Sequence, residues 1–252
     1  MSSLKKQIIE KERVLSIFVT AGYPERDSLL KVIPELEKSG VDFVEIGIPF
    51  SDPLADGATI QESSQIALNN GMTLELLLEQ LEELNRQISV PIVLMGYVNP
   101  VLQYGLGKFL AKCRNLKVAG LIIPDISFDL YCSHYKEIFE SSGVPLIHLV
   151  TADSKEQRIR SIDDQSKEFI YVLSSSSTTG KSQGFADEQK DLFRKVQELG
   201  LHHPTMLGFG IHDSESFEEA CRYFDGAIIG SAFIRHLEKG LEPAEFVRSI
   251  KG

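Results

Sequence analysis

Three carboxylate residues lie close together in the segment VEIGIPFSDPLADGATIQ, which spans residues 44–61. Glu45 stands inside an apolar run, and Asp52 and Asp56 follow it in a stretch that contains two prolines and a glycine. Burial of a carboxyl group is costly unless the group is paired, and burial raises its pKa. A carboxyl group with a raised pKa is suited to general acid–base catalysis near neutral pH. Glu45 and Asp56 are therefore our candidates for catalytic residues.

Each candidate also has a purely structural interpretation. Glu45 could belong to a polar network at the end of a strand. Asp56 could cap a helix that starts near Thr59, because aspartate is a favoured N-cap residue. The sequence favours a functional Glu45, since charged side chains are rarely buried without a reason, and it leaves both interpretations of Asp56 open.

Short apolar runs alternate with amphipathic stretches along all 252 residues. The runs are rich in valine, isoleucine, leucine and phenylalanine without strict polar alternation, as in parallel strands that are buried on both faces. We predict strands at 14–20, 42–48, 91–97, 119–125, 145–150, 168–174, 205–210 and 226–231. We predict helices at 26–39, 73–88, 105–115, 127–141, 154–162, 187–199, 213–222 and 242–251, with Pro34 kinking the first of these or delaying its start.

Eight strand–helix units in succession predict an α/β fold, a (β/α)₈ TIM barrel that forms one domain over residues 1–252. An extra N-terminal helix, predicted at 2–12, could plug the floor of the barrel. An open doubly wound sheet is the alternative, and the count of eight without a long central break favours the barrel.

A barrel would collect its chemistry at the carboxyl ends of the strands. Alternation along the strand 42–48 puts Glu45 on the face opposite to the aliphatic residues, so we expect its side chain to point into the barrel near the upper end. Two long loops at this end, 48–57 and 175–186, are candidates for lids over a site.

Glycine-rich sequences close the last two predicted strands, at 207–210 and 229–232. Barrels often bind phosphate with the loops after strands seven and eight, because glycines admit the ligand close to backbone N–H groups. The hydroxyl of Ser231 could add to such a site. Ordinary turn glycines are the alternative, and their presence at both strands favours phosphate binding.

Four aromatic residues fall near the upper ends of strands, as expected for the walls of a pocket for a flat hydrophobic ligand: Phe18, Tyr97, Tyr171 and Phe209. By contrast, the six histidines show no metal-ligand spacing, so no metal site is expected, and His148 is expected to be a hydrogen-bonded core residue.

The bulk composition limits the partners and the compartment. A net charge of −10 argues against nucleic acid and anionic membranes as partners. The chain has three separated cysteines without a CxxC pair, no signal-peptide pattern at its start and no apolar run near the roughly 20 residues of a membrane span. These features predict a cytoplasmic protein.

The whole chain resembles the tryptophan synthase α subunit family. The segment 44–61 is similar to a long motif of that family, and shorter motifs follow the family's order: FVTAGYP (18–24), MGYVNP (95–100), TTG (178–180), GFGI (208–211) and IGSA (229–232). The resemblance implies cleavage of indole-3-glycerol phosphate, by a retro-aldol reaction, to indole and glyceraldehyde 3-phosphate.

The resemblance also implies a role for each site residue. Glu45 would act as acid and base, and Asp56 would accept the indole N–H and stabilise the positive charge that develops on the ring. The remaining members of the predicted site contact the indole ring or the phosphate: Phe18, Ile60, Tyr97, Tyr171, Thr179, Gly180, Phe209, Gly210, Gly230 and Ser231.

The resemblance further implies no cofactor in this chain and a partner β subunit that carries pyridoxal phosphate in an αββα heterotetramer. Asp52, Pro53 and residues 101–105 would lie near that interface.

The sequence departs from the family pattern in two loops. Ser175, Ser177 and Thr178 stand where the family usually has arginine and glycine-valine, and Ser127 replaces a usual proline. These departures concern lid closure and coupling to β more than the chemistry. An activator subunit without catalysis and a related sugar-phosphate isomerase remain the alternative functions.

Overall fold

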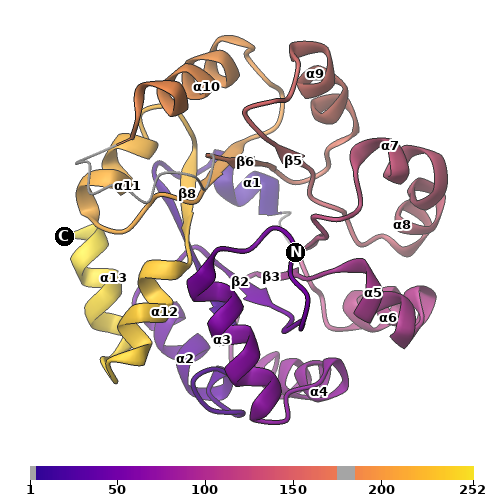
Figure 1. The fold of residues 1–252 in the computed structure, drawn as a ribbon, viewed down its shortest axis with the longest axis vertical. Helices are drawn as coiled ribbons and strands as arrows, with labels where there is room; N and C mark the ends of the chain where they lie inside the picture. Colours follow the sequence, from indigo (N-terminus) through magenta and orange to yellow (C-terminus); the bar gives the residue numbers. More distant parts are fainter. Residues whose placement is uncertain (1–3, 175–184) are drawn as a thin grey trace.

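The computed structural model describes residues 4–174 and 185–252. Eight parallel strands curl around a common axis, and the helices surround them (Figure 1). The strands are β1 Val14–Thr20, β2 Phe43–Gly47, β3 Ile92–Met95, β4 Gly120–Ile122, β5 Leu149–Val150, β6 Ile170–Leu173, β7 Thr205–Gly208 and β8 Gly226–Ile229. All eight predicted strands are confirmed, each within its expected range.

The order of the strands confirms the barrel over the open doubly wound sheet. Neighbours run β4-β3-β2-β1-β8-β7-β6-β5, without the reversal of strand order that marks a doubly wound sheet. The outer strand β4 is joined to the segment that leads into β5 by a parallel bridge between Leu121 and Leu146. There the Leu121 N–H donates to the Pro145 carbonyl at 2.9 Å, and the Ile147 N–H donates to the Leu121 carbonyl at 2.7 Å. This short seam closes the sheet.

The helices follow the predicted pattern with three additions. They are α1 Leu4–Ile9, α2 Leu29–Lys38, α3 Ala58–Asn69, α4 Leu74–Leu84, α5 Val98–Tyr104, α6 Leu106–Asn115, α7 Phe128–Leu130, the π-helix η1 Tyr131–Tyr135, α8 Lys136–Ser142, α9 Glu156–Gln165, α10 Asp187–Glu198, α11 Ser214–Ala220, α12 Ser231–Glu238 and α13 Pro243–Lys251. Helices α3, α5 and α12 were not among the predicted ranges, and a helix that starts near Thr59 was considered only in the N-cap interpretation of Asp56. Helix α2 begins at Leu29 rather than at residue 26, and it continues through Pro34.

Helix α4 illustrates why these sequences form these elements. Its leucines at three- and four-residue spacing are buried, and the Thr73 hydroxyl accepts a hydrogen bond from the Leu76 N–H at 3.1 Å. A leucine stripe at this spacing and a threonine at the N-cap are features that favour an amphipathic helix.

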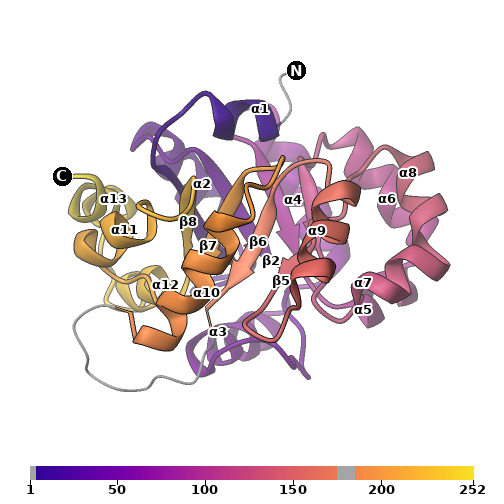
Figure 2. The same cartoon turned by 90° about the horizontal axis from the view of Figure 1, so that it is seen from above.

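The amino-terminal helix covers the floor of the barrel. Leu4 and Ile8 of α1 are buried, and the Lys5 N–H donates to a carboxylate oxygen of Glu168 at 2.6 Å. Figure 2 shows α1 on the side of the molecule opposite to α3, which follows β2. The predicted extra helix is therefore present at the end of the barrel that faces away from the carboxyl ends of the strands.

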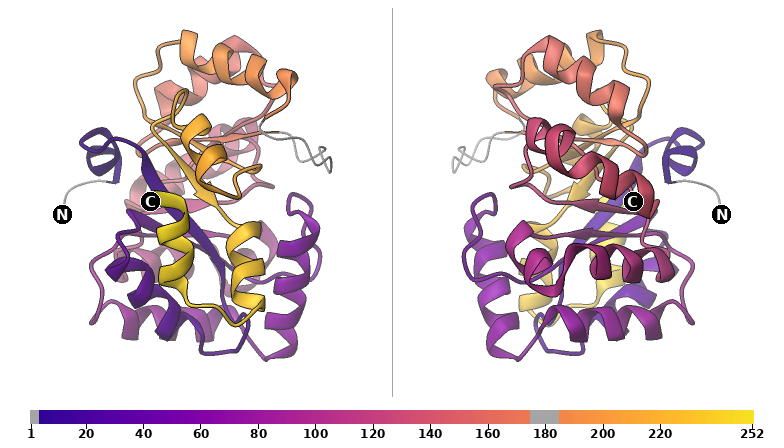
Figure 3. Two further views of the ribbon diagram at one scale, coloured as in Figure 1. Left: turned by 90° about the vertical axis from the view of Figure 1, so that its left-hand side faces the viewer. Right: turned by 90° about the vertical axis from the view of Figure 1, so that its right-hand side faces the viewer.

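The first and last units of the barrel lie against each other. Helices α12 and α13 contact α3 and α2, respectively, and Figure 3 shows the yellow and indigo-to-purple helices side by side.

Along the parts of the chain that the structure describes, no helix combines the length and apolarity needed to cross a membrane.

We predict that Gly226→Ala destabilises the fold. An added Cβ would lie 2.7 Å from the Val14 Cβ and closer still to the Val14 carbonyl oxygen, a backbone atom of the paired strand β1 that cannot move aside cheaply. Overpacking of this kind lowers the free energy of unfolding by roughly 1–3 kcal/mol, which urea titration measures. Gly107→Ala in α6 is the control, because its added Cβ meets no atom within 4 Å. Equal effects of the two substitutions would contradict the prediction.

Candidate active site

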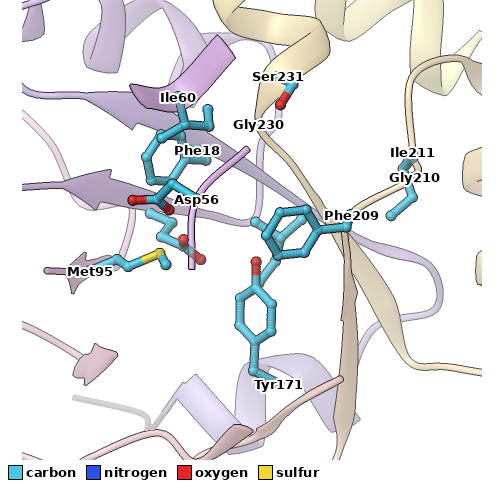
Figure 4. A pocket seen from close by; sticks show the side chains of 12 residues that line it. Phe18, Asp56, Ile60, Met95, Tyr171, Phe209, Gly210, Ile211, Gly230 and Ser231 are labelled. Atoms are coloured by element: carbon cyan, nitrogen blue, oxygen red, sulfur yellow. The ribbon is translucent and has the colours of Figure 1, made fainter. Parts of the chain in front are cut away.

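A cavity opens at the carboxyl ends of the strands, where a barrel places its active site. It has a volume of about 510 Å³, including space that is open to solvent. Its lining comes from strands or following loops on both halves of the barrel: Phe18, Glu45, Asp56, Ile60, Met95, Tyr171, Phe209, Gly210, Ile211, Ile228, Gly230 and Ser231. Figure 4 shows Phe18, Asp56 and Met95 on one side, and Tyr171 and Phe209 across from them.

Glu45 projects from the middle of β2 and is fully buried. Its strand neighbours in register are Phe18 and Val93. Neither carboxylate oxygen has a hydrogen-bond partner within residues 4–174 and 185–252. Burial, with a smaller contribution from the negative charge of Asp56, raises the pKa of Glu45 to about 8. The alternative of a structural glutamate in a polar network is therefore wrong for the described part of the chain.

Asp56 lies at the end of the loop that links β2 to α3. One of its carboxylate oxygens, Oδ2, accepts a hydrogen bond from the Tyr97 hydroxyl at 2.9 Å. Burial raises the pKa of Asp56, and the hydrogen bond from Tyr97 opposes that rise. The N-cap of α3 is Gly57. The interpretation of Asp56 as an N-cap is therefore wrong, and its carboxylate faces the cavity instead.

Two strand glycines make room for the aromatic walls. An added Cβ at Gly47 would overlap the ring of Phe18, and one at Gly208 would overlap the ring of Tyr171. Tyr171 is itself buried, and burial together with the charges of Glu45 and Asp56 raises the pKa of its hydroxyl well above the ordinary value. The Tyr171 phenol therefore remains protonated beside the two carboxyl groups.

Backbone groups that follow β7 and β8 form a further part of the cavity wall. Phe209 and Gly210 adopt positive φ angles of 67° and 81°, which turn the chain sharply after β7. Helix α12 starts at Ser231 with Gly230 as its N-cap, and both residues line the cavity. The first N–H groups of a helix have no partner inside the helix, so they are available to an anionic ligand.

The cavity brings together nine of the twelve predicted site residues: Phe18, Glu45, Asp56, Ile60, Tyr171, Phe209, Gly210, Gly230 and Ser231. Tyr97 is not part of the lining, and it contacts the site through Asp56. Thr179 and Gly180 lie outside the described residues, as do Ser175, Ser177 and Thr178 and most of the predicted lid at 175–186.

Three lining residues were missed by the sequence reasoning. Met95 ends β3 two positions after Val93, the register partner of Glu45, so alternation could have identified it. Ile228 could have been found in the same way, because it pairs with Ser16 of β1, two positions before Phe18. Ile211 follows the turn at Gly210, and no periodic signal points to it.

His148 differs from its expected state. It is buried between the rings of Phe128 and Tyr131, outside the cavity lining and just before β5. Its Nε2 atom has no hydrogen-bond partner in the described structure, so the prediction of a hydrogen-bonded side chain was wrong. Burial lowers the pKa of His148 to about 4, which keeps the ring neutral.

Comparison with known proteins agrees with the resemblance seen in the motifs. The family model described as tryptophan synthase alpha chain matches residues 4–249. The tryptophan synthase alpha chain of Flavobacterium psychrophilum is 48% identical over 252 residues, which cover 99% of this chain and 100% of the relative. That of Christiangramia forsetii is 47% identical over 253 residues, with 100% and 99% covered.

Solved structures have the same fold. A chain of the tryptophan synthase complex from Pyrococcus furiosus superposes with a TM-score of 0.84 at 32% identity, over 96% of this chain and 97% of that one. A protein from Aquifex aeolicus gives a TM-score of 0.87 at 30% identity, over 100% and 98%. The chain therefore belongs to the tryptophan synthase alpha chain family, whose members are lyases of tryptophan biosynthesis.

Proposed function

We propose that this chain cleaves indole-3-glycerol phosphate to indole and glyceraldehyde 3-phosphate by a retro-aldol reaction. The observation that carries the proposal is Glu45, a fully buried carboxyl group without a hydrogen-bond partner among the described residues, in the wall of a largely apolar cavity. The family membership supports the same reaction.

Glu45 would first act as the acid. With a pKa near 8 it is largely protonated at neutral pH, so it can donate its proton to C3 of the indole ring. The carboxylate that this leaves can then accept the proton of the hydroxyl group on the adjacent side-chain carbon. As that carbon becomes a carbonyl, the bond to C3 breaks and its electron pair returns to the ring. One proton leaves Glu45 and one returns, so the group is ready for the next turnover.

Asp56 would stabilise the charge that the first step creates. Protonation at C3 makes the ring nitrogen cationic, and a carboxylate that accepts the indole N–H lowers the energy of that cation. The opposing sides of the cavity, with Phe18 and Tyr171, would hold the flat ring between them. The backbone of Gly210, Gly230 and Ser231 would bind the phosphate, and Thr179 and Gly180 are proposed as the remaining contacts.

The chemistry needs no group beyond the chain's own residues. The described lining of the cavity contains no lysine to which pyridoxal phosphate could attach, and the described residues hold no cluster of three metal-binding side chains. We propose that pyridoxal phosphate belongs to a partner β subunit in an αββα assembly. Complexes named tryptophan synthase among the similar structures support this partner.

Two exposed leucines stand in or beside the segments of the proposed β interface. Leu54 and Leu102 are 86% and 47% exposed, close to the predicted interface positions Asp52, Pro53 and 101–105. Burial of these two side chains in a complex would favour binding of the β subunit. We also propose that the protein acts in the cytoplasm and that residues 1–252 form one domain.

The activator and isomerase alternatives are less well supported. The activator alternative leaves the burial of Glu45 beside Asp56 without a purpose. The isomerase alternative could use an acid–base carboxyl group, but the family membership does not support it. Indole formation from indole-3-glycerol phosphate, measured with and without a β subunit, tests the proposal directly. Indole release by this chain, alone or with β, supports the proposal when β alone releases none, whereas no release in either mixture contradicts it.

We predict that Glu45→Gln lowers kcat for indole formation at least a hundredfold, because an amide cannot exchange the proton. Circular dichroism should show an unchanged fold. Glu62→Gln, an exposed substitution on α3, is the matched control and should retain the wild-type rate. Wild-type turnover by the Glu45→Gln variant would refute the acid–base assignment.

We predict a pH-dependent difference in stability between the wild type and Glu45→Gln. The pKa of Glu45 is about 8 in the folded chain against a model value of 4.5, so the folded state binds the extra proton between these values. The free energy of unfolding of the wild type should therefore fall, relative to that of the variant, by up to roughly 1.4 kcal/mol per pH unit from pH 5 to pH 8. Urea titrations at several pH values measure this difference, and parallel curves would exclude the raised pKa.

We predict that Asp56→Asn lowers kcat at least tenfold while the KM changes little, because the amide keeps an acceptor oxygen but loses the negative charge that stabilises the cationic ring. Steady-state indole assays measure both constants. Asp164→Asn, an exposed change on α9, serves as the control. An increase in KM at an unchanged kcat would instead indicate that Asp56 only binds the substrate.

A further inference from the structure

We propose that Asp125 is a positioning residue for the reaction proposed above. Through the backbone at Tyr97, it holds the phenol that fixes the Asp56 carboxylate at the cavity. Asp125 lies in the loop between β4 and α7, outside the cavity lining, so its contribution would be made entirely through Tyr97.

The first link joins Asp125 to the start of α5. Both carboxylate oxygens of Asp125 accept the N–H of Val98, the first residue of that helix, at 3.0 and 3.1 Å. Tyr97 is the N-cap residue of α5, and its side chain makes no capping hydrogen bond. A neighbouring loop thus supplies the acceptor that a serine or aspartate would supply at an ordinary N-cap. The negative charge also suits the positive end of the helix dipole.

The second link joins Tyr97 to the β2–α3 loop. The Tyr97 hydroxyl accepts the N–H of Ala55 at 2.9 Å and donates to Oδ2 of Asp56 at 2.9 Å. The Tyr97 ring packs against that of Phe50, with 5.2 Å between the ring centroids. The phenol is therefore held on its ring face and at its oxygen by one loop, while its backbone is held by another.

The orientation of Asp56 depends on this arrangement. Because Tyr97 binds Oδ2, the second oxygen, Oδ1, is left for a donor on the ligand, and an ionised carboxylate can accept at both atoms. Small displacements of a catalytic group lower rates steeply, since the reacting geometry is lost. Release of the Tyr97 backbone would let the phenol, and with it Asp56, move from that position.

A plain helix cap would behave differently from a positioning residue. If Asp125 only stabilises α5, its removal lowers stability and leaves the catalytic constants of the folded enzyme unchanged. If Asp125 acts through Tyr97, its removal lowers kcat, and it has no further effect once the Tyr97 hydroxyl is gone.

A double-mutant cycle on the full chain tests the inference. We expect Asp125→Ala and Tyr97→Phe each to lower kcat for indole formation about tenfold, the loss of roughly one hydrogen bond to a charged group, with the KM within about threefold of that of the wild type. The double variant should be no slower than Tyr97→Phe. Asp125→Asn should retain most of the activity, because its amide oxygen still accepts the Val98 N–H. The control is Asp129→Ala, an exposed aspartate four residues later that pairs with Arg158.

Additive losses in the double variant, or a folded Asp125→Ala with the wild-type kcat, would overturn the inference. If Asp125→Ala does not fold, Asp125→Leu takes its place, because its branched side chain fills a similar space but has no acceptor for the Val98 N–H. A wild-type kcat in that variant would equally overturn the inference.

A second readout needs no substrate and separates this inference from the proposed function. In a titration of ¹³C-labelled aspartate, the apparent pKa of Asp56 should rise both in Tyr97→Phe and in Asp125→Ala, because both variants would lose the hydrogen bond that opposes the effect of burial. The nearby groups that titrate, Glu45 and Tyr171, are the same in every variant. An unchanged Asp56 titration in Asp125→Ala refutes the positioning role, whereas a wild type that releases no indole refutes only the proposed reaction.

Discussion

The site depends on the energetic cost of keeping the Glu45 carboxyl group in a place where it is fully buried and has no hydrogen-bond partner in the described structure. Burial of an ionised carboxylate in such surroundings is strongly unfavourable, so the group holds its proton at a pH where an ordinary glutamate has lost it. The packing of the core compensates for this cost. Strand β2 lies between β1 and β3, and many apolar contacts of the core fix the direction of its side chains. The same burial that lowers the stability of the fold near neutral pH supplies an acid at the cavity wall.

The second carboxylate shows how neighbouring loops act together in this fold. Consecutive strands of the barrel are adjacent, so the loops after β2, β3 and β4 meet at one rim. Hydrogen bonds between these loops connect Asp125, Tyr97 and Asp56. Asp56 thus differs from Glu45 in physical character. A buried strand fixes Glu45, whereas hydrogen bonds between loops hold Asp56, which leaves Asp56 more sensitive to changes that lie outside the cavity.

Most of the fold and part of the site could be predicted from the sequence. Features that follow from a local pattern were predicted, whereas features that depend on contacts between distant residues were not. Alternation along β2 predicted the direction of Glu45, because side chains of a strand point to opposite faces whatever else the chain does. Helices α5 and α12 were missed because they are only seven and eight residues long and follow strand ends that contain glycine. The hydrogen bond between Tyr97 and Asp56 joins residues 41 positions apart, and no local pattern encodes such a pair. The unpaired Nε2 of His148 was missed for a related reason, since burial can be predicted from the neighbouring sequence but hydrogen-bond partners cannot.

The chemistry of the site depends on the protonation state of Glu45, and infrared spectroscopy can observe that state directly. A protonated carboxyl group in an apolar site gives a C=O stretching band that is separate from those of ionised carboxylates, and the difference between wild type and Glu45→Gln isolates it. We expect this band to be present at pH 6 and to disappear with an apparent midpoint near pH 8. A band that has already disappeared by pH 6, or a midpoint near the ordinary glutamate value, would contradict the account.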